Sequence, residues 1–163
     1  MKNLKVWQLI LGLVLVVGGT VLFVLAVSGA FGESKVMLSS EYICGDDCNG
    51  EYIELSAEDY EKLITDKKSF VVLVDQGGCT TADRLEGFAK DWAVENGVKE
   101  HKIMFEDMKQ TSLHDSVKYY PSFVVVSNGK VVGFLRADSD EDADAYNKYE
   151  AFGKWVEKYL KKS

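Results

Sequence analysis

The chain has 163 residues, with 19 basic and 26 acidic side chains and a formal net charge of −7. An acidic surface repels the phosphates of nucleic acids and anionic lipid headgroups, so no nucleic-acid partner is expected. The expected partner is therefore a protein or a small molecule. A chain of this length can bury one substantial core.

An uncharged segment at residues 6–31 stands near the start of the chain. As a helix it would be about 39 Å long, enough to cross a hydrocarbon core with some tilt. Lys2 and Lys5 precede it and mainly acidic residues follow it. This charge bias predicts a cytoplasmic N-terminus at residues 1–5, a single-pass transmembrane anchor in the cell membrane, and an extracytoplasmic C-terminal domain. A cleaved signal peptide is the alternative, because residues 28–30 have the small side chains of a cleavage site.

Residues 32–50 are polar and show neither a helical nor a strand period, so they are expected to form an extracytoplasmic stalk, with a short lead-in to a hairpin as the alternative. Cys44 and Cys48 lie there, in a compartment where disulfides persist. A local structural disulfide is favoured, and closing so short a loop would contribute roughly 2 kcal/mol. Two alternatives stay open, a redox pair and a source of a second thiol for Cys79. No metal site is expected, because zinc would need further ligands at a suitable spacing.

Residues 51–163 then alternate between strand and helix patterns. A weak strand is expected at residues 51–55, and Ser56 with Asp59 resembles the capping box of a short helix. The continuous apolar run at residues 70–74 predicts a strand that is covered on both faces.

The next helix begins at Cys79, because apolar residues from 82 to 93 recur three and four apart. Asn96 and Gly97 end it. A strand is expected at residues 102–106, and a short helix follows that stops at Tyr120-Pro121.

The strands on either side of Asn128-Gly129 form a predicted hairpin. The acidic run at residues 137–146 resembles the start of a calcium loop, but Ala143 and Tyr149 replace its glycine and its bidentate glutamate. We therefore expect a solvated loop before the last helix, whose apolar face runs from Tyr149 to Leu160. His101 and His114 have no visible partner and are expected at the surface.

The order β-α-β-α-β-α-β-β-α indicates a mixed α/β sandwich. This order, the cysteine at the start of the second helix, the "YYPSF" some forty residues later and the following Asn128-Gly129 together resemble the thioredoxin-like fold. The resemblance covers roughly residues 51–162. It implies a central mixed sheet flanked by helices, with a cis peptide bond before Pro121 opposite the active-site cysteine. In its general form the chain is similar to small membrane-anchored thioredoxin-like proteins of Gram-positive bacteria.

The active-site motif is degenerate in this sequence. The family motif is Cys-x-x-Cys, in which the first thiolate attacks a disulfide and the second cysteine resolves the intermediate. Here Cys79 keeps the attacking position, but Ala82 stands in the resolving one. Asp83 opposes the thiolate that the helix N-terminus would stabilise. Leu73 occupies the position where many thioredoxins bury an aspartate, and Asp75 is expected to lie past the buried part of the strand.

Two functions follow from the resemblance. In the first, Cys79 is catalytic and exchanges with protein thiols or disulfides, while Gly78, Thr80, Thr81, Tyr120, Pro121 and Ser122 shape a substrate groove. In the second, the domain is a redox-inactive binding or accessory module for an exported protein or a membrane complex, and Cys79 is a packing residue. Neither function requires a cofactor.

Overall fold

The computed structural model describes residues 35–161. The predicted anchor at residues 6–31 lies outside the described residues. Within residues 35–161, no helix combines the length and the hydrophobicity needed to span a bilayer.

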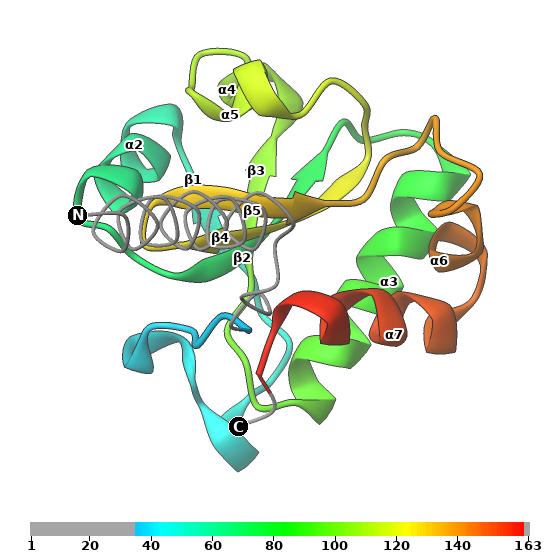
Figure 1. Cartoon of the computed structure of the whole chain (residues 1–163), viewed down its shortest axis with the longest axis horizontal. Helices are drawn as coiled ribbons and strands as arrows, with labels where there is room; N and C mark the ends of the chain where they lie inside the picture. The colour runs from blue at the N-terminus through cyan, green and yellow to red at the C-terminus, as the bar shows by residue number, and fades with distance from the viewer. Residues whose placement is uncertain (1–34, 162–163) are drawn as a thin grey trace, which may run out of the picture. The chain divides into compact units, whose positions relative to one another are not determined.

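A five-stranded mixed sheet forms the centre of the domain (Figure 1). Its strands lie in the order β1 (Ile53–Leu55), β3 (His101–Met104), β2 (Phe70–Asp75), β4 (Ser122–Ser127) and β5 (Lys130–Phe134). Strands β1 and β2 pair with β3 in parallel, whereas β4 is antiparallel to both β2 and β5. Every residue of β2 is buried, as the continuous apolar run predicted.

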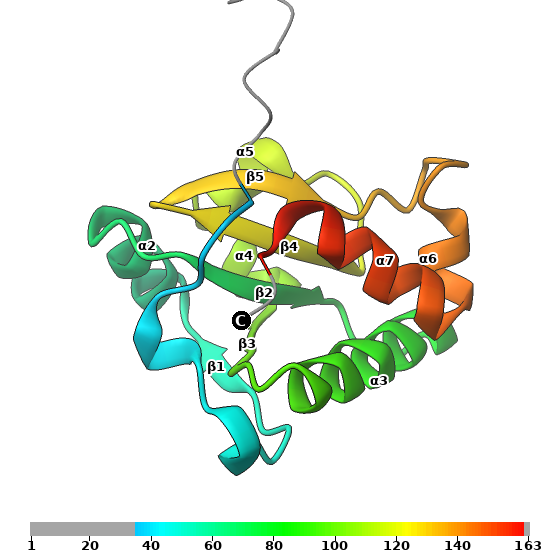
Figure 2. The same cartoon turned by 60° about the horizontal axis from the view of Figure 1, so that its bottom comes forward.

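Helices cover both faces of this sheet. One face carries α3 (Thr80–Glu95), α6 (Ala143–Asn147) and α7 (Tyr149–Tyr159), which Figure 2 shows on one side of the strands. The other face carries α2 (Ala57–Thr65), α4 (Phe105–Met108) and α5 (Leu113–Ser116). Alternate residues of β2 enter the two cores, because successive side chains of a strand point to opposite faces. Val71 and Leu73 pack under α3 and α7, whereas Val72 and Val74 pack under α2, α4 and α5.

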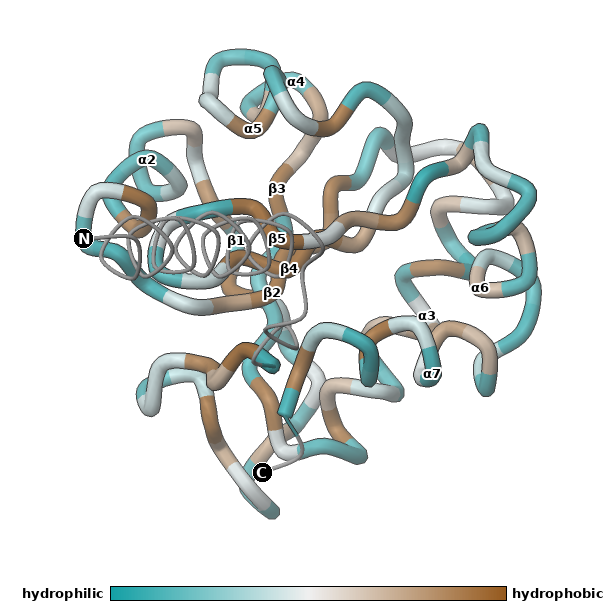
Figure 3. The backbone as a smooth tube through the Cα atoms, in the orientation of Figure 1, coloured by the Kyte–Doolittle hydropathy of each residue, from teal (hydrophilic) through white to brown (hydrophobic). Residues whose placement is uncertain are grey.

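Hydrophobic residues concentrate in the central strands, and the helices alternate between hydrophobic and hydrophilic positions (Figure 3). Several local predictions are confirmed. Ser56 and Asp59 form a complete capping box at the start of α2. Asn128 and Gly129 both have positive φ, 49° and 73°, and join β4 to β5 as a hairpin.

The stalk prediction is wrong for residues 35–50, which belong to the domain. Val36 forms a parallel bridge with Leu160, and Ile43 forms an antiparallel bridge with Val98. The buried ring of Tyr42 packs edge-on against His101, with ring centroids 4.5 Å apart. Two short 3-10 helices, Ser40–Tyr42 and Gly45–Asp47, complete the segment. Its anchoring side chains are spaced irregularly, so no sequence period reveals them.

The solvated-loop prediction is wrong for the end of the acidic run, where α6 forms. Asp142 is only 8% exposed, and its Oδ2 accepts a hydrogen bond from the backbone N–H of Arg136 at 2.9 Å. Ala145 and Tyr146 are buried on the sheet. Within the described residues, no group of three or more histidine, cysteine or acidic side chains is placed to hold a metal ion.

Candidate functional site

Cys79 is the N-cap residue of α3, and its thiol is free and half-buried. Its Sγ accepts a hydrogen bond from the backbone N–H of Ala82 at 3.3 Å, and Gln76 Nε2 lies 3.9 Å from the same sulfur. An N–H group in the first turn of a helix stabilises negative charge on a nearby sulfur. Gly78, Thr80 and Thr81 flank the thiol and are exposed. Cys79 is therefore partly exposed, and its sulfur accepts a hydrogen bond from the first turn of α3.

Two glycines bring the chain from β2 to this position. Gly77 and Gly78 have φ values of 68° and 71°, in the left-handed region that favours glycine. The backbone N–H of Gly77 donates to Oδ1 of Asp75 at 2.9 Å. The two glycines thus turn the chain sharply between a buried strand and the start of α3.

The Tyr120-Pro121 peptide bond is cis, as the resemblance implied. Ser122 pairs with Val74 in the sheet, so the chain before β4 and the chain after β2 lie at the same end of the sheet. The side chain of Ser122 is fully buried, and its hydroxyl donates to the Leu135 carbonyl oxygen at 2.7 Å. Ser122 therefore stabilises the fold, and its side chain does not line an open groove.

Two contacts hold the segment around Pro121 in place. The hydroxyl of Tyr146 donates to the Pro121 carbonyl oxygen at 2.8 Å. The half-buried ring of Tyr120 packs on Phe105, with ring centroids 4.3 Å apart. Pro121 is itself buried. Tyr146 lies in the acidic run at residues 137–146, whose pattern predicts a solvated loop, so this contact has no local signature in the sequence.

Asp75 is buried, 5% exposed, and the prediction that it lies past the buried part of the strand is wrong. The ammonium group of Lys102 lies 2.9 Å from Oδ2 of Asp75 and 2.9 Å from Oε1 of Glu86. Burial favours the protonated carboxyl, but the hydrogen bonds from Gly77 N–H and Lys102 outweigh burial and lower the pKa of Asp75. A paired carboxylate thus lies directly behind the loop that carries Cys79.

Two further ionisable residues are buried on the sheet. Glu100 is 2% exposed, and neither carboxyl oxygen has a hydrogen-bond partner among the described residues. His101 is 1% exposed, and its Nδ1 lies 3.2 Å from the Val71 carbonyl oxygen. Burial lowers the pKa of His101 to about 4, so the ring is neutral at pH 7. The surface prediction is therefore wrong for His101, and His114 is half-buried.

Cys44 and Cys48 form a disulfide, the pairing that the sequence favoured. The backbone N–H groups of Cys44 and Gly45 donate to the Gly97 carbonyl oxygen, which places the disulfide loop at the C-terminal end of α3. Cys79 lies at the N-terminal end of the same 16-residue helix, and a helix of that length is about 24 Å long. In this structure the pair cannot act as a resolving thiol for Cys79.

No protein-family model matches the chain, and no curated protein sequence matches it. Solved structures do match. A mutant thioredoxin from Halobacterium salinarum aligns with a TM-score of 0.51 at 16% identity, covering 72% of this chain and 97% of that one. A thioredoxin pre-protein from Schistosoma mansoni aligns with a TM-score of 0.50 at 18% identity, covering 68% and 99%.

The chain has a thioredoxin-like fold. At these identities the similarity establishes the fold, and the function is argued from the site.

Proposed function

We propose that this protein exchanges thiols and disulfides with partner proteins through the single thiol of Cys79. The observation that carries this proposal is the hydrogen bond from Ala82 N–H to Sγ of Cys79 at the first turn of α3. Cys79 is partly exposed, and the cis Tyr120-Pro121 bond lies at the same end of the sheet. A stabilised and accessible thiolate is the species that attacks disulfides.

The exchange needs an external reductant, because Ala82 supplies no second thiol. The Cys79 thiolate attacks one sulfur of a partner disulfide, the S–S bond breaks, and the other partner sulfur leaves as a thiolate that takes a proton from water. A low-molecular-weight thiol then attacks the sulfur of Cys79, releases the second partner thiolate and forms a new mixed disulfide. A second molecule of that thiol restores the free Cys79 and leaves as a disulfide. The partner gains two electrons, and the external thiols lose them.

Asp75 and Lys102 act as positioning residues in this proposal. The carboxylate of Asp75 accepts a hydrogen bond from the N–H of Gly77 and forms an ion pair with Lys102. These two contacts fix the loop before Cys79 to the sheet. The first-turn donor of α3 thereby stays aimed at the sulfur of Cys79.

We further propose that residues 6–31 anchor the protein in the cell membrane and that the domain lies outside the cytoplasm. The uncharged length of the segment and the lysines before it support this orientation. The disulfide between Cys44 and Cys48 also suits an oxidising compartment.

A redox-inactive binding module is the second candidate, and two observations favour it. Ala82 occupies the resolving position and is only 2% exposed, while Asp83 places a negative charge in the first turn of α3. Such a domain would keep the surface around Pro121 and bind an exported protein or a membrane complex without chemistry.

Alkylation and gain of function separate the two candidates. Cys79 in the folded full-length chain should react with iodoacetamide at neutral pH, and Asp83→Lys should speed the reaction about two- to fivefold by removing a first-turn repulsion. Asp91→Lys makes the same charge change two to three turns further along α3 and should have little effect. Ala82→Cys should gain catalytic reduction of a model protein disulfide, and Cys79→Ser should abolish that gain. An inert Cys79 and an inactive Ala82→Cys variant would leave the binding module as the function.

A further inference from the structure

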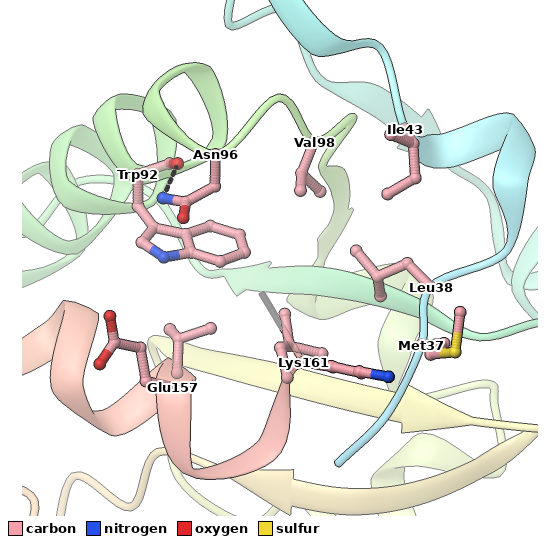
Figure 4. Close-up of a pocket in the computed structure, with 10 residues that line it drawn as sticks. Met37, Leu38, Ile43, Trp92, Asn96, Val98, Glu157 and Lys161 are labelled. Atoms are coloured by element: carbon pink, nitrogen blue, oxygen red, sulfur yellow. Dashed lines mark hydrogen bonds between the residues drawn. The ribbon is translucent and has the colours of Figure 1, made fainter. Parts of the chain in front are cut away.

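An apolar pocket of about 280 Å³ lies beside the C-terminal end of α3 (Figure 4). Cys79 caps the opposite end of that helix. The pocket is enclosed by residues 37–43 and by the C-terminal ends of α3 and α7. Its apolar walls include Met37, Leu38, Ile43, Trp92, Val98 and Leu160. Figure 4 shows Leu38, Ile43 and Val98 on one side of the opening and Trp92 on the other.

The chemistry of the walls suits a hydrocarbon group. The amide of Asn96 donates to the Trp92 carbonyl oxygen at 2.8 Å, so this hydrogen-bonding group is already engaged. Apolar cavities of about 150 Å³ already bind benzene, and this pocket has room for a larger apolar group. Met37 and Ile43, at 70% and 40% exposed, leave apolar surface open to solvent beside it. Exposed apolar surface next to an apolar cavity marks a place where a hydrophobic ligand can bind.

The pocket also lies where the chain enters the domain. The backbone N–H of Val36 donates to the Tyr159 carbonyl oxygen at 2.7 Å, and the N–H of Lys161 donates to the Val36 carbonyl oxygen at 3.0 Å. Met37, the next residue, already lines the pocket. Only five residues separate Phe31, the last residue of the uncharged segment, from Met37. Extended chain of that length spans about 20 Å at most, so a membrane holding residues 6–31 would keep this pocket near its surface.

Lysines flank the same point of the chain. Lys35 and Lys161 are exposed, and Lys162 follows in the sequence. Glu157 is the acidic residue among those lining the pocket. The chain beyond residue 31 carries 17 basic and 26 acidic residues, a net charge of −9, so these lysines stand out against an acidic background. Basic side chains close to a membrane surface attract anionic headgroups.

We propose that this pocket binds an acyl chain of a membrane phospholipid, with Lys35 and Lys161 beside an anionic headgroup. The proposal rests on the membrane attachment proposed above. It gives the domain a fixed orientation, because α3 runs from the pocket at its C-terminal end to Cys79 at its N-terminal end. The thiol then faces away from the bilayer, toward exported proteins.

Photolabelling of the full-length chain tests this proposal. The chain is reconstituted into vesicles that contain phosphatidylglycerol with a photoreactive diazirine near the end of one acyl chain. After irradiation and digestion, mass spectrometry should find labelled peptides from residues 37–43, 92–98 or 156–161, besides the label expected in residues 6–31. The double variant Met37→Glu/Ile43→Glu should lose most of the pocket label. Val132→Glu changes an equally exposed apolar residue on β5, outside the pocket, and should keep it.

Flotation of the vesicles reports attachment separately from labelling. A chain that floats but carries label only in residues 6–31 would overturn the pocket proposal and leave the attachment standing. Pocket label that the double variant keeps in full would also overturn it. A chain that does not float would show that the attachment itself fails, and the pocket proposal would fail with it.

Discussion

Glu100 is a buried carboxyl group that no hydrogen bond compensates. It lies directly before β3, and both of its oxygens are without a partner among the described residues. Burial raises the pKa of Glu100 well above its ordinary value, and the charge of Glu86 raises it further, while Lys102 partly opposes both. Such a group binds a proton in the folded state that it releases in the unfolded state.

Glu100→Gln should therefore change how stability depends on pH. A raised folded-state pKa means that the contribution of Glu100 to stability is fully present below the unfolded pKa of about 4.3 and is lost as pH rises through the folded pKa. Glutamine cannot ionise. The free energy of unfolding of the variant should therefore increase relative to that of the natural chain as the pH is raised. Urea denaturation at a series of pH values measures the two free energies of unfolding. The titration of His101 affects both proteins equally and therefore cancels from their difference.

Glu150→Gln is the matched control, because Glu150 is exposed on α7. The difference in free energy of unfolding between Glu150→Gln and the natural chain should stay nearly constant with pH. A Glu100→Gln difference that is equally flat would show that the carboxyl of Glu100 is solvated in the folded protein.

At this scale the sequence predicted residues with a local signature and missed those defined by tertiary contacts. Cys79 was placed at a helix start by the pattern that follows it, and the cis bond before Pro121 by a family resemblance. Asp75, Glu100 and His101 were missed because their burial depends on which strand lies beside them. The only local sign was that Asp75 directly follows a continuous apolar run.

Helix α3 separates two sulfur sites. The thiol of Cys79 caps its first turn, and the disulfide loop of Cys44 and Cys48 packs on its last turn through the Gly97 carbonyl oxygen. A helix of this length separates its ends by about 24 Å. The disulfide should therefore act on the stability of the fold and not on the chemistry of the thiol.

The double substitution Cys44→Ala/Cys48→Ala tests this separation. Loss of a loop this short should lower the free energy of unfolding by about 2 kcal/mol, because the unfolded chain regains conformational freedom. The rate at which iodoacetamide alkylates Cys79 in the folded state should stay unchanged. Urea denaturation and timed alkylation measure the two effects on one preparation. A severalfold change in the alkylation rate would mean that the disulfide and the thiol are coupled after all.

Regular elements were predictable from the sequence, and irregular ones were not. The strands, α2, α3 and α7 have hydrophobic patterns that match their geometry, and the hairpin has its Asn-Gly pair. The prediction for residues 102–106 is wrong at its end, because β3 stops at Met104 and Phe105 begins α4. Residues 35–50 join the domain through isolated backbone bridges and through single buried side chains such as Val36 and Tyr42, spaced without any period. Helix α6 forms because Ala145 and Tyr146 pack into the core on the sheet, although the surrounding sequence is acidic.

At the scale of the whole molecule, α3 separates two points of the domain. The chain enters the domain at Val36, near the C-terminal end of α3, and the thiol of Cys79 lies at its N-terminal end. Val36 forms a bridge with Leu160, and the pocket next to this pair includes Trp92 from the last turn of α3 and Asn96, its C-cap residue. Cys79 is at the first turn. A domain tethered through residue 35 would present its thiol on the side away from the tether. This arrangement suits a protein that acts on partners outside the membrane.

Labelling of single cysteines in spheroplasts tests that topology. Cys79 is the free thiol of the described chain, and the other two cysteines of the sequence are joined, so a membrane-impermeant maleimide reports its side of the membrane directly. We expect Cys79 to be labelled in intact spheroplasts. Asn3→Cys in a Cys79→Ser background should be labelled only after lysis if, as proposed, the lysines beside it keep the N-terminus in the cytoplasm. The reverse pattern would contradict the orientation, and a released chain beginning near Phe31 would show that the segment is a cleaved signal peptide.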